Sequence, residues 1–191
     1  AQVISHHYDV SNRFYEWVLG STMAYTCAVF PNADATLEQA QEEKFDLVCR
    51  KLGLEPGMRV LDVGCGWGGF AMHAAQHYGV DVIAVTLSEQ QARWGQQAVR
   101  DAGLEGQIDI RHSDYRAVTE TGFDRVASIG LTEHIGKKNY PDYFSFLRGK
   151  LVDGGRLLNH CITRTDPTER TYTRNGFINR YVFPDGELVH V

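Results

Sequence analysis

The stretch Val60–Phe70, VLDVGCGWGGF, decides the fold. Its first residues are apolar enough for a buried strand, and Gly64, Gly66 and Gly69 follow with the spacing G-x-G-x-x-G. Between a strand and a helix, glycines in this pattern let the backbone turn tightly and approach a ligand that no Cβ obstructs. The stretch predicts a strand–loop–helix unit that binds a nucleotide-like ligand; a glycine-rich turn without a ligand is the alternative.

Strand-like and helix-like segments alternate along the chain. Apolar runs predict five strands, at residues 58–64, 80–87, 107–114, 123–131 and 154–163. Helices are expected between them and before the first of them, at 34–54, 69–79, 88–104 and 140–151. This alternation indicates an α/β fold with a mostly parallel, doubly wound, Rossmann-like sheet. A single domain over residues 1–191 is expected, with an N-terminal helical lid at 1–53 and the core at 54–191.

The helix expected at residues 34–54 carries its own start and stop signals. Thr36 or Asp34 can cap its first turn, and Gly53 ends it. Ser88 is the expected N-cap of the helix at 88–104. The buried face of the first helix is expected to be a mostly apolar stripe formed by Leu37, Ala40, Lys44, Leu47, Val48 and Leu52.

Composition excludes several classes of protein. The chain has 191 residues, and 43% of them are hydrophobic, which is typical of a globular domain. Its net charge of −5 argues against a nucleic-acid-binding protein, which usually has a basic face. No apolar run approaches the ~18 residues of a membrane-spanning helix, and no signal peptide is recognisable. The four cysteines form no C-x-x-C pair, so free thiols in the cytoplasm are expected. No cluster of carboxylates lies near His6 and His7 in the sequence, and no metal site is predicted.

An acidic residue next to the glycines indicates the class of ligand. A nicotinamide site needs a carboxylate at the end of the second strand, but that strand ends in AVTLS, so a dehydrogenase is disfavoured. The acid lies instead at Asp62, just before Gly64. A strand that ends in D-x-G-x-G resembles the first motif of methyltransferases that use S-adenosylmethionine (SAM). Asp114, after the third strand, resembles the residue that reads the adenine amino group in those enzymes.

Several further blocks, in order, resemble the cyclopropane-fatty-acid synthases, a family that includes the mycolic-acid cyclopropane synthases. The resemblance covers nearly the whole chain. The blocks are YDVSNRFYEWVLG, MAYTCAVF, LDVGCGWGGFAMHAA, VTLSEQQ, DYRA, FDRVASIGLTEHIG, YFSFLRGKLVDGGRLL and YVFPDGEL.

The resemblance implies a reaction. SAM would donate a methyl group to the cis double bond of an unsaturated fatty acyl chain on a phospholipid, and loss of a proton would close a cyclopropane. A bound bicarbonate ion is the implied base, held by Cys27, Glu133, His160 and the Ile162 backbone. Glu133 would orient the anion, whereas His134 either supports the site or packs at the strand end.

The resemblance also implies a set of cofactor contacts. They are Tyr8, Tyr25, Thr26, Asp62, Gly64, Gly66, Thr86, Leu87, Gln91, Asp114 and Tyr115. Tyr8 and Tyr25 would reach the SAM carboxylate, Thr86, Leu87 and Gln91 the ribose and methionine, and Asp114 and Tyr115 the adenine. Tyr8 and Tyr25 as core aromatics, and helix capping at Ser88, are the alternatives. Trp67 is expected to pack around the cofactor or in the core, and Cys65 to fill space.

Two departures from the family pattern concern the cradle for the anion. The family's tyrosine block would follow Val191, so a truncated member without the late strands of the sheet is expected. YTC and NHCI stand where the family more often has YSC and LHTI. A relative that makes methyl- or methylene-branched chains and a non-catalytic SAM-binding fragment are the alternatives.

The location and the carrier of the acyl chain are further expectations. The protein is expected in the cytoplasm, with peripheral contact at the inner membrane face, where Lys137 and Lys138 can touch lipid headgroups. An acyl chain bound to a carrier protein is an alternative to a phospholipid. The sequence leaves the oligomeric state open.

Overall fold

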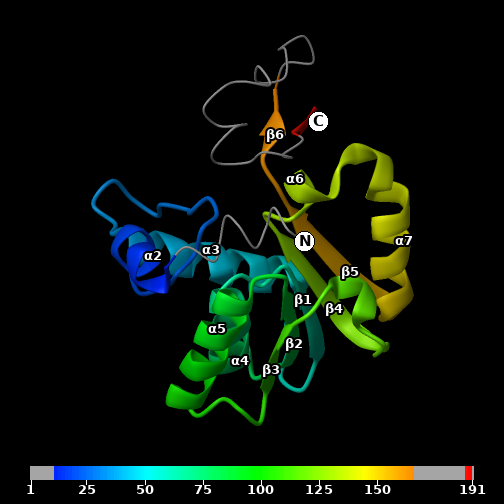
Figure 1. Ribbon diagram of the computed structural model, residues 1–191, viewed down its shortest axis with the longest axis horizontal. Helices are drawn as coiled ribbons and strands as arrows, with labels where there is room; N and C mark the ends of the chain where they lie inside the picture. Colours follow the sequence, from blue (N-terminus) through cyan, green and yellow to red (C-terminus); the bar gives the residue numbers. More distant parts are fainter. Residues whose placement is uncertain (1–10, 166–187, 191) are drawn as a thin grey trace.

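A five-stranded parallel sheet forms the centre of the protein (Figure 1). The computed structural model describes residues 11–165 and 188–190, so Tyr8, His6 and His7 lie outside the described residues. The strands, in the order β3-β2-β1-β4-β5, are β1 (Arg59–Val63), β2 (Asp81–Thr86), β3 (Ile108–His112), β4 (Phe123–Ile129) and β5 (Leu151–His160). All neighbouring pairs are parallel. The strand order reverses between β1 and β4, and this switch point is where such sheets bind ligands.

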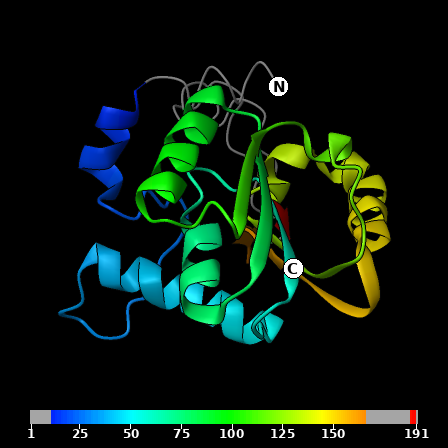
Figure 2. The same cartoon turned by 90° about the horizontal axis from the view of Figure 1, so that it is seen from below.

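Helices cover both faces of the sheet (Figure 2). They are α2 (Asn12–Leu19), α3 (Leu37–Leu52), α4 (Gly69–Tyr78), α5 (Glu89–Asp101), α6 (Thr132–Ile135) and α7 (Tyr140–Lys150). Short 3-10 turns lie at η1 (Tyr115–Ala117) and η2 (Lys137–Asn139), and β6 (Thr163–Arg164) pairs with β7 (Val189–His190). None of the helices in the described part of the chain is long and apolar enough to cross a membrane.

The alternation of side chains along β1 divides the core into two layers. Val60 points into the layer that α3, α4 and α5 cover, whereas Leu61 and Val63 point into the layer that α7 covers. All three side chains are fully buried, and each contributes roughly 1.5–3 kcal/mol through the hydrophobic effect. Since both faces of β1 are covered, a continuous apolar run was the correct signal for this strand.

The predicted caps are confirmed. Thr36, rather than Asp34, caps α3: its Oγ1 accepts a hydrogen bond from the Gln39 amide at 3.2 Å, and Gln39 Oε1 accepts one from the Thr36 amide at 3.0 Å. Gly53 ends the helix at φ +62°, where glycine is favoured. Ser88 Oγ accepts a hydrogen bond from the Gln91 amide at 3.2 Å and so caps α5.

Three details differ from the expectations. After β4 the chain forms the helical turn α6, where the sequence predicted only the end of a strand and a turn at Gly136. Strand β5 begins at Leu151 rather than Gly154, because a shift in register against β4 accommodates the two glycines. In the stripe of α3, Leu37 is exposed and Leu47 only half-buried, whereas Phe45 and Cys49 are buried.

Gly95 of α5 is expected to tolerate no side chain. A Cβ there would lie 2.9 Å from the Trp67 carbonyl oxygen and 2.8 Å from Ile110 Cδ1, so helix and glycine loop would have to separate. Gly95→Ala is expected to lower the free energy of unfolding by about 1–3 kcal/mol. Gly149→Ala on α7 is the matched control: a Cβ there meets nothing within 4 Å, and stability should rise by about 0.5–1 kcal/mol. Urea denaturation measures both, and equal effects would contradict the account.

Candidate active site

A cavity lies at the switch point of the sheet. Its empty volume, including the part open to solvent, is about 930 Å³. The glycine loop, the ends of β2 and β4, the segment 23–26 and α3 all contribute to its wall. Nine of the predicted cofactor residues line it: Tyr25, Thr26, Asp62, Gly64, Gly66, Thr86, Leu87, Gln91 and Tyr115.

The glycine loop forms a backbone cradle on the floor of this cavity. The amides of Gly64 and Cys65 both donate to the Val85 carbonyl, at 2.9 and 3.0 Å, which fastens the loop to β2. Gly64 and Gly66 have φ of +78° and +57°, a region that other residues enter only with strain. A Cβ on Gly66 would meet no atom within 4 Å. The loop therefore leaves space for a ligand to lie directly against its backbone.

Gly69, by contrast, is required for packing. A Cβ on this residue would lie 2.9 Å from the Thr22 carbonyl oxygen and 3.0 Å from the Phe45 ring. The third glycine of the motif therefore allows α4 to approach α3 and the segment before it.

Two buried charged side chains face the cavity. Asp62 at the end of β1 is 2% exposed, and its Oδ2 has no hydrogen-bond partner among the described residues. Burial raises the Asp62 pKa to about 7, although the charge of Lys44 opposes this shift. Lys44 of α3 is 3% exposed, and burial lowers its pKa to about 8. By its spacing alone, Lys44 belongs to the mostly apolar stripe of α3, and a lysine at such a core position is the signal of a role in the site.

The block TLSEQQ after β2 lines the cavity and also caps α5. Thr86 Oγ1 donates to Gln91 Oε1 at 2.7 Å, and both side chains are buried in the cavity wall beside Leu87. Ser88 caps α5 in the same turn. Helix capping therefore fixes the positions of the groups that line the cavity.

Asp114 is engaged by Arg116 and is not among the residues that line the cavity, so its contact with adenine stays a prediction. Its Oδ2 pairs with Arg116 Nη2 at 2.6 Å, and its Oδ1 accepts from the Arg116 amide at 2.9 Å. These contacts hold the pKa of Asp114 below its usual range. Because capping of η1 occupies the carboxylate, the neighbours Ser113 and Tyr115 line the cavity in its place.

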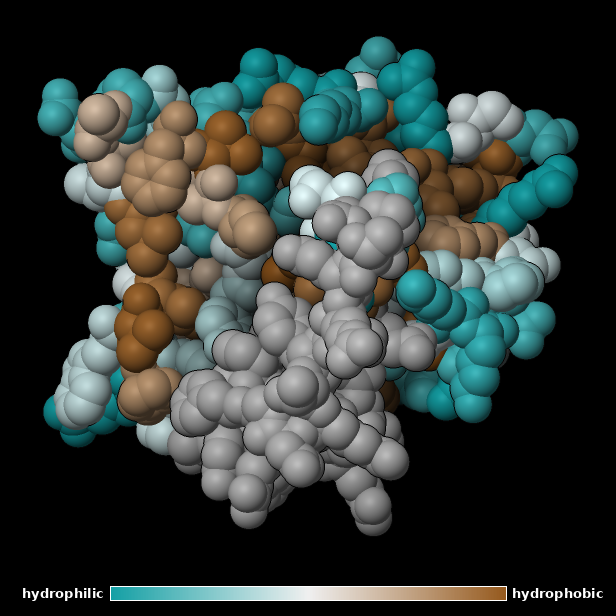
Figure 3. Space-filling model, turned by 90° about the horizontal axis from the view of Figure 1, so that it is seen from above, coloured by the Kyte–Doolittle hydropathy of each residue, from teal (hydrophilic) through white to brown (hydrophobic). Residues whose placement is uncertain are grey.

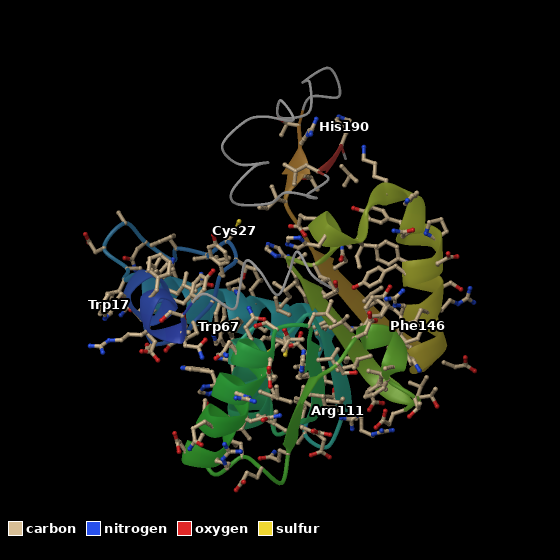
Figure 4. All side chains as sticks on the ribbon, viewed as in Figure 1. Trp17, Cys27, Trp67, Arg111, Phe146 and His190 are labelled. Atoms are coloured by element: carbon tan, nitrogen blue, oxygen red, sulfur yellow. The ribbon has the colours of Figure 1, made fainter. Side chains whose placement is uncertain are left out.

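Trp67 connects α2 to the glycine loop (Figure 4). Its contacts on α2 are with Asn12 and Tyr15. The indole N–H donates to Asn12 Oδ1 at 2.9 Å, and the indole ring lies 4.8 Å from the ring of Tyr15. Trp67 is 2% exposed and also lines the cavity, so it is both a core residue and part of the site. Tyr25 also lines the cavity, lies 5.9 Å from the ring of Tyr15 and is exposed. Cys65 fills space in the loop, and burial raises its pKa.

A second set of polar groups lies where β4 and β5 end. Glu133 of α6 is buried; its Oε1 accepts from the Ile162 amide at 2.8 Å, and its Oε2 has no hydrogen-bond partner in the described part of the chain. His160 Nδ1 is likewise buried without such a partner. Burial lowers the His160 pKa, and Lys44 lowers it further while Glu133 opposes this, so the neutral imidazole is favoured.

The structure brings only part of the predicted anion cradle together. Glu133, His160 and Ile162 lie close, and the Ile162 amide donates to Glu133 Oε1; the role of the Ile162 backbone in holding an anion stays a prediction. Cys27 is exposed, yet near enough to raise the pKa of Lys44. His134 lines the cavity, so it takes part in the site rather than only packing at the strand end.

Comparisons with known proteins identify relatives of the chain. The chain is 66% identical to a probable fatty acid methyltransferase of Mycobacterium tuberculosis, over 98% of this chain and 44% of that protein. It is 42% identical to the cyclopropane-fatty-acyl-phospholipid synthase of Escherichia coli K12, over 97% of this chain and 46% of that protein. The chain thus spans about half the length of these relatives.

Solved structures show the same fold. The cyclopropane synthase MmaA2 from Mycobacterium tuberculosis superposes with a TM-score of 0.91 at 34% identity, over 99% of this chain and 70% of that one. The mycolic acid cyclopropane synthase CmaA1, complexed with SAH and CTAB, gives 0.89 at 38% identity, over 98% and 69%. The family profile described as mycolic acid cyclopropane synthetase matches residues 1–191. With the sheet order, the glycine loop and the buried Asp62, this match shows that the chain belongs to the mycolic acid cyclopropane synthetase family.

Proposed function

We propose that the protein transfers a methyl group from SAM to the cis double bond of an unsaturated fatty acyl chain of a phospholipid and closes it to a cyclopropane. One observation carries the proposal: a buried carboxylate, Glu133, with an unpartnered oxygen, lies beside a glycine-loop cavity that contains Asp62. Relatives described as a cyclopropane-fatty-acyl-phospholipid synthase and as fatty acid methyltransferases support it.

The cavity fits SAM. The unpartnered Oδ2 of Asp62 suits the cofactor's ammonium group, and the space above Gly66 suits close contact with the backbone. Thr86 and Gln91 would hold the ribose, and Tyr115 the adenine. When bound, SAM supplies a methyl group on a positively charged sulfur. The aromatic faces of Tyr25 and Trp67 would stabilise the positive charge that develops on the acyl chain.

The polar groups around Glu133 fit a bicarbonate ion. Glu133 Oε2 would accept a hydrogen bond from the bicarbonate hydroxyl. His160, in the tautomer that is protonated at Nδ1, would donate a hydrogen bond to another oxygen of the ion. Both atoms are buried and lack partners among the described residues, and such atoms are costly unless a ligand satisfies them. Held there, the ion would take the proton released by the new methyl group.

Peripheral contact with the inner face of the cytoplasmic membrane is part of the proposal. Exposed aromatic residues gather on and near α2, where Phe14, Trp17 and Phe30 are 50%, 75% and 57% exposed. Figure 3 shows apolar residues along the side of the molecule where α2 and α3 lie. Lys137 and Lys138 of η2 are exposed as well, and cations of this kind bind anionic headgroups.

Mass spectrometry of lipids from cells that express the protein tests this function. Unsaturated phospholipids are expected to gain the mass of one CH₂ group, in a form that resists hydrogenation. A gain that fragmentation assigns to a methyl or methylene branch would support the branching alternative. If SAM binds but no lipid changes, the acyl substrate is wrong and the alternative of a SAM-binding fragment gains support.

A further inference from the structure

We infer that Lys44 receives the carboxylate of the methionine moiety of SAM, so that Lys44 and Asp62 together recognise its zwitterionic end. The inference rests on the proposed function, because it assumes that SAM occupies the cavity. It assigns a binding role to a side chain on α3, outside the glycine loop and the strand ends.

The surroundings of Lys44 call for an anion. Its Nζ donates to Thr26 Oγ1 at 2.9 Å and lies 4.0 Å from the centre of the Phe45 ring. None of the ion pairs within residues 11–165 and 188–190 involves Lys44. Buried charges in proteins are normally paired, because the loss of hydration is costly. A ligand carboxylate would supply the missing partner.

The charge pattern of the cavity matches the methionine end of SAM. This end carries an ammonium and a carboxylate on the same carbon atom. Asp62 and Lys44 line the same cavity. Their opposite charges interact, because Lys44 lowers the pKa of Asp62 and Asp62 raises the pKa of Lys44. The carboxylate of Asp62 suits the ligand's ammonium, and the ammonium of Lys44 suits the ligand's carboxylate.

Thr26 extends the same subsite. Its oxygen accepts from Lys44, which leaves its own O–H to donate, and Thr26 lines the cavity. Gln41, one turn before Lys44 on α3, donates to the Thr26 carbonyl at 2.8 Å and to the Ala24 carbonyl at 3.4 Å. Residues three apart on a helix share a face, so α3 fixes both the cation and the segment that carries Thr26. This explains two buried polar side chains on an otherwise apolar helix face.

The small anion near Glu133 is the competing partner for Lys44. Lys44 lowers the pKa of His160, and Cys27 raises the pKa of Lys44, so Lys44 lies near the residues expected to hold that anion. However, Lys44 shares the lined cavity with Thr26 and Asp62. The groups that line this cavity therefore favour the cofactor carboxylate.

Calorimetric titration with S-adenosylhomocysteine (SAH) and with its decarboxylated analogue, which keeps the amine, tests the inference. The protein is expected to prefer SAH by roughly 10- to 100-fold, the effect of one charged hydrogen bond. Lys44→Met should abolish this preference by weakening SAH alone. Gln41→Met releases the Thr26 segment but keeps the cation, so it should lower the preference for SAH less than Lys44→Met does and should not abolish it.

The pH dependence of the unsubstituted protein is a second readout that needs no variant. The preference for SAH should fall as the pH rises above about 8, because Lys44 then loses its proton. The groups that face Lys44 are Asp62 from β1, His160 from β5, and Cys27 and Thr26 from the segment before α3. The pKa values of Asp62 and His160 lie below this pH range, so their titration does not account for a fall in the preference there.

The outcomes separate the two proposals. If neither ligand binds the unsubstituted protein, the proposed function fails. If SAH binds and Lys44→Met keeps the preference, only the assignment of Lys44 fails. If Lys44→Met keeps the preference but changes the bicarbonate dependence of methyl transfer, Lys44 serves the small anion and the inference is overturned.

Discussion

Replacement of Glu133 by glutamine is expected to slow methyl transfer to lipid by about 10²- to 10⁴-fold and to leave the affinity for SAH unchanged. The reason is the different state of the two carboxylate oxygens. Oε1 already accepts from the Ile162 amide, and glutamine keeps this acceptor. Oε2 is buried without a partner in the described residues, and an NH₂ group in its place cannot accept the hydrogen bond of a bicarbonate hydroxyl. Transfer of a tritiated methyl group from SAM to lipid measures the rate.

A surface carboxylate provides the control for this substitution. Glu120 pairs with Arg111 at 2.8 Å, is about one-third exposed and is not among the residues that line the cavity. Glu120→Gln removes the same charge and should leave the rate unchanged. An undiminished rate in Glu133→Gln, or a loss of SAH binding, would show that Glu133 does not hold the base.

Asp62→Asn is expected to weaken SAH binding by roughly 10- to 100-fold and at the same time to stabilise the free protein at neutral and alkaline pH. The buried carboxylate suits the ammonium group of the ligand, and asparagine lacks its charge. Without the ligand, the same carboxylate is a cost to folding, because burial raises its pKa from 3.8 to about 7. Calorimetry measures the first effect and urea denaturation the second.

The sign of the stability change follows from proton linkage. Between pH 3.8 and about 7 the folded protein holds the Asp62 proton, whereas the unfolded chain has lost it. The free energy of unfolding is therefore not reduced by Asp62 below this window, and it falls as the pH rises through the window. Asparagine has no such dependence. The variant and the unsubstituted protein should match below the window and differ above it; a gap that is constant with pH would contradict this assignment.

The main elements of the fold were predictable because local signals and tertiary packing agree. The strand before Gly64 is apolar on both faces, and the structure buries both faces. Thr36, Gly53 and Ser88 act within one helical turn of themselves, so sequence alone indicates where α3 and α5 begin or end. Short-range capping of this kind depends little on the rest of the molecule.

Parts of the site could not be predicted because they depend on contacts between distant or competing groups. The role of Lys44 requires α3 to lie against the segment 24–26, which no local pattern encodes. The resemblance assigned Asp114 to adenine, but Arg116, two residues away, engages its carboxylate. The Ile162 amide similarly meets Glu133 only once β5 and α6 are side by side.

The most direct test of the central claim is methyl transfer by the purified protein from SAM with a trideuterated methyl group to vesicles of a cis-unsaturated phospholipid. Ring closure removes one hydrogen isotope from the transferred group. The account predicts an acyl product that retains two deuterium atoms and resists hydrogenation. A product that retains all three would contradict ring closure, and an acyl chain without deuterium, in a sample that binds SAH, would contradict the lipid substrate itself.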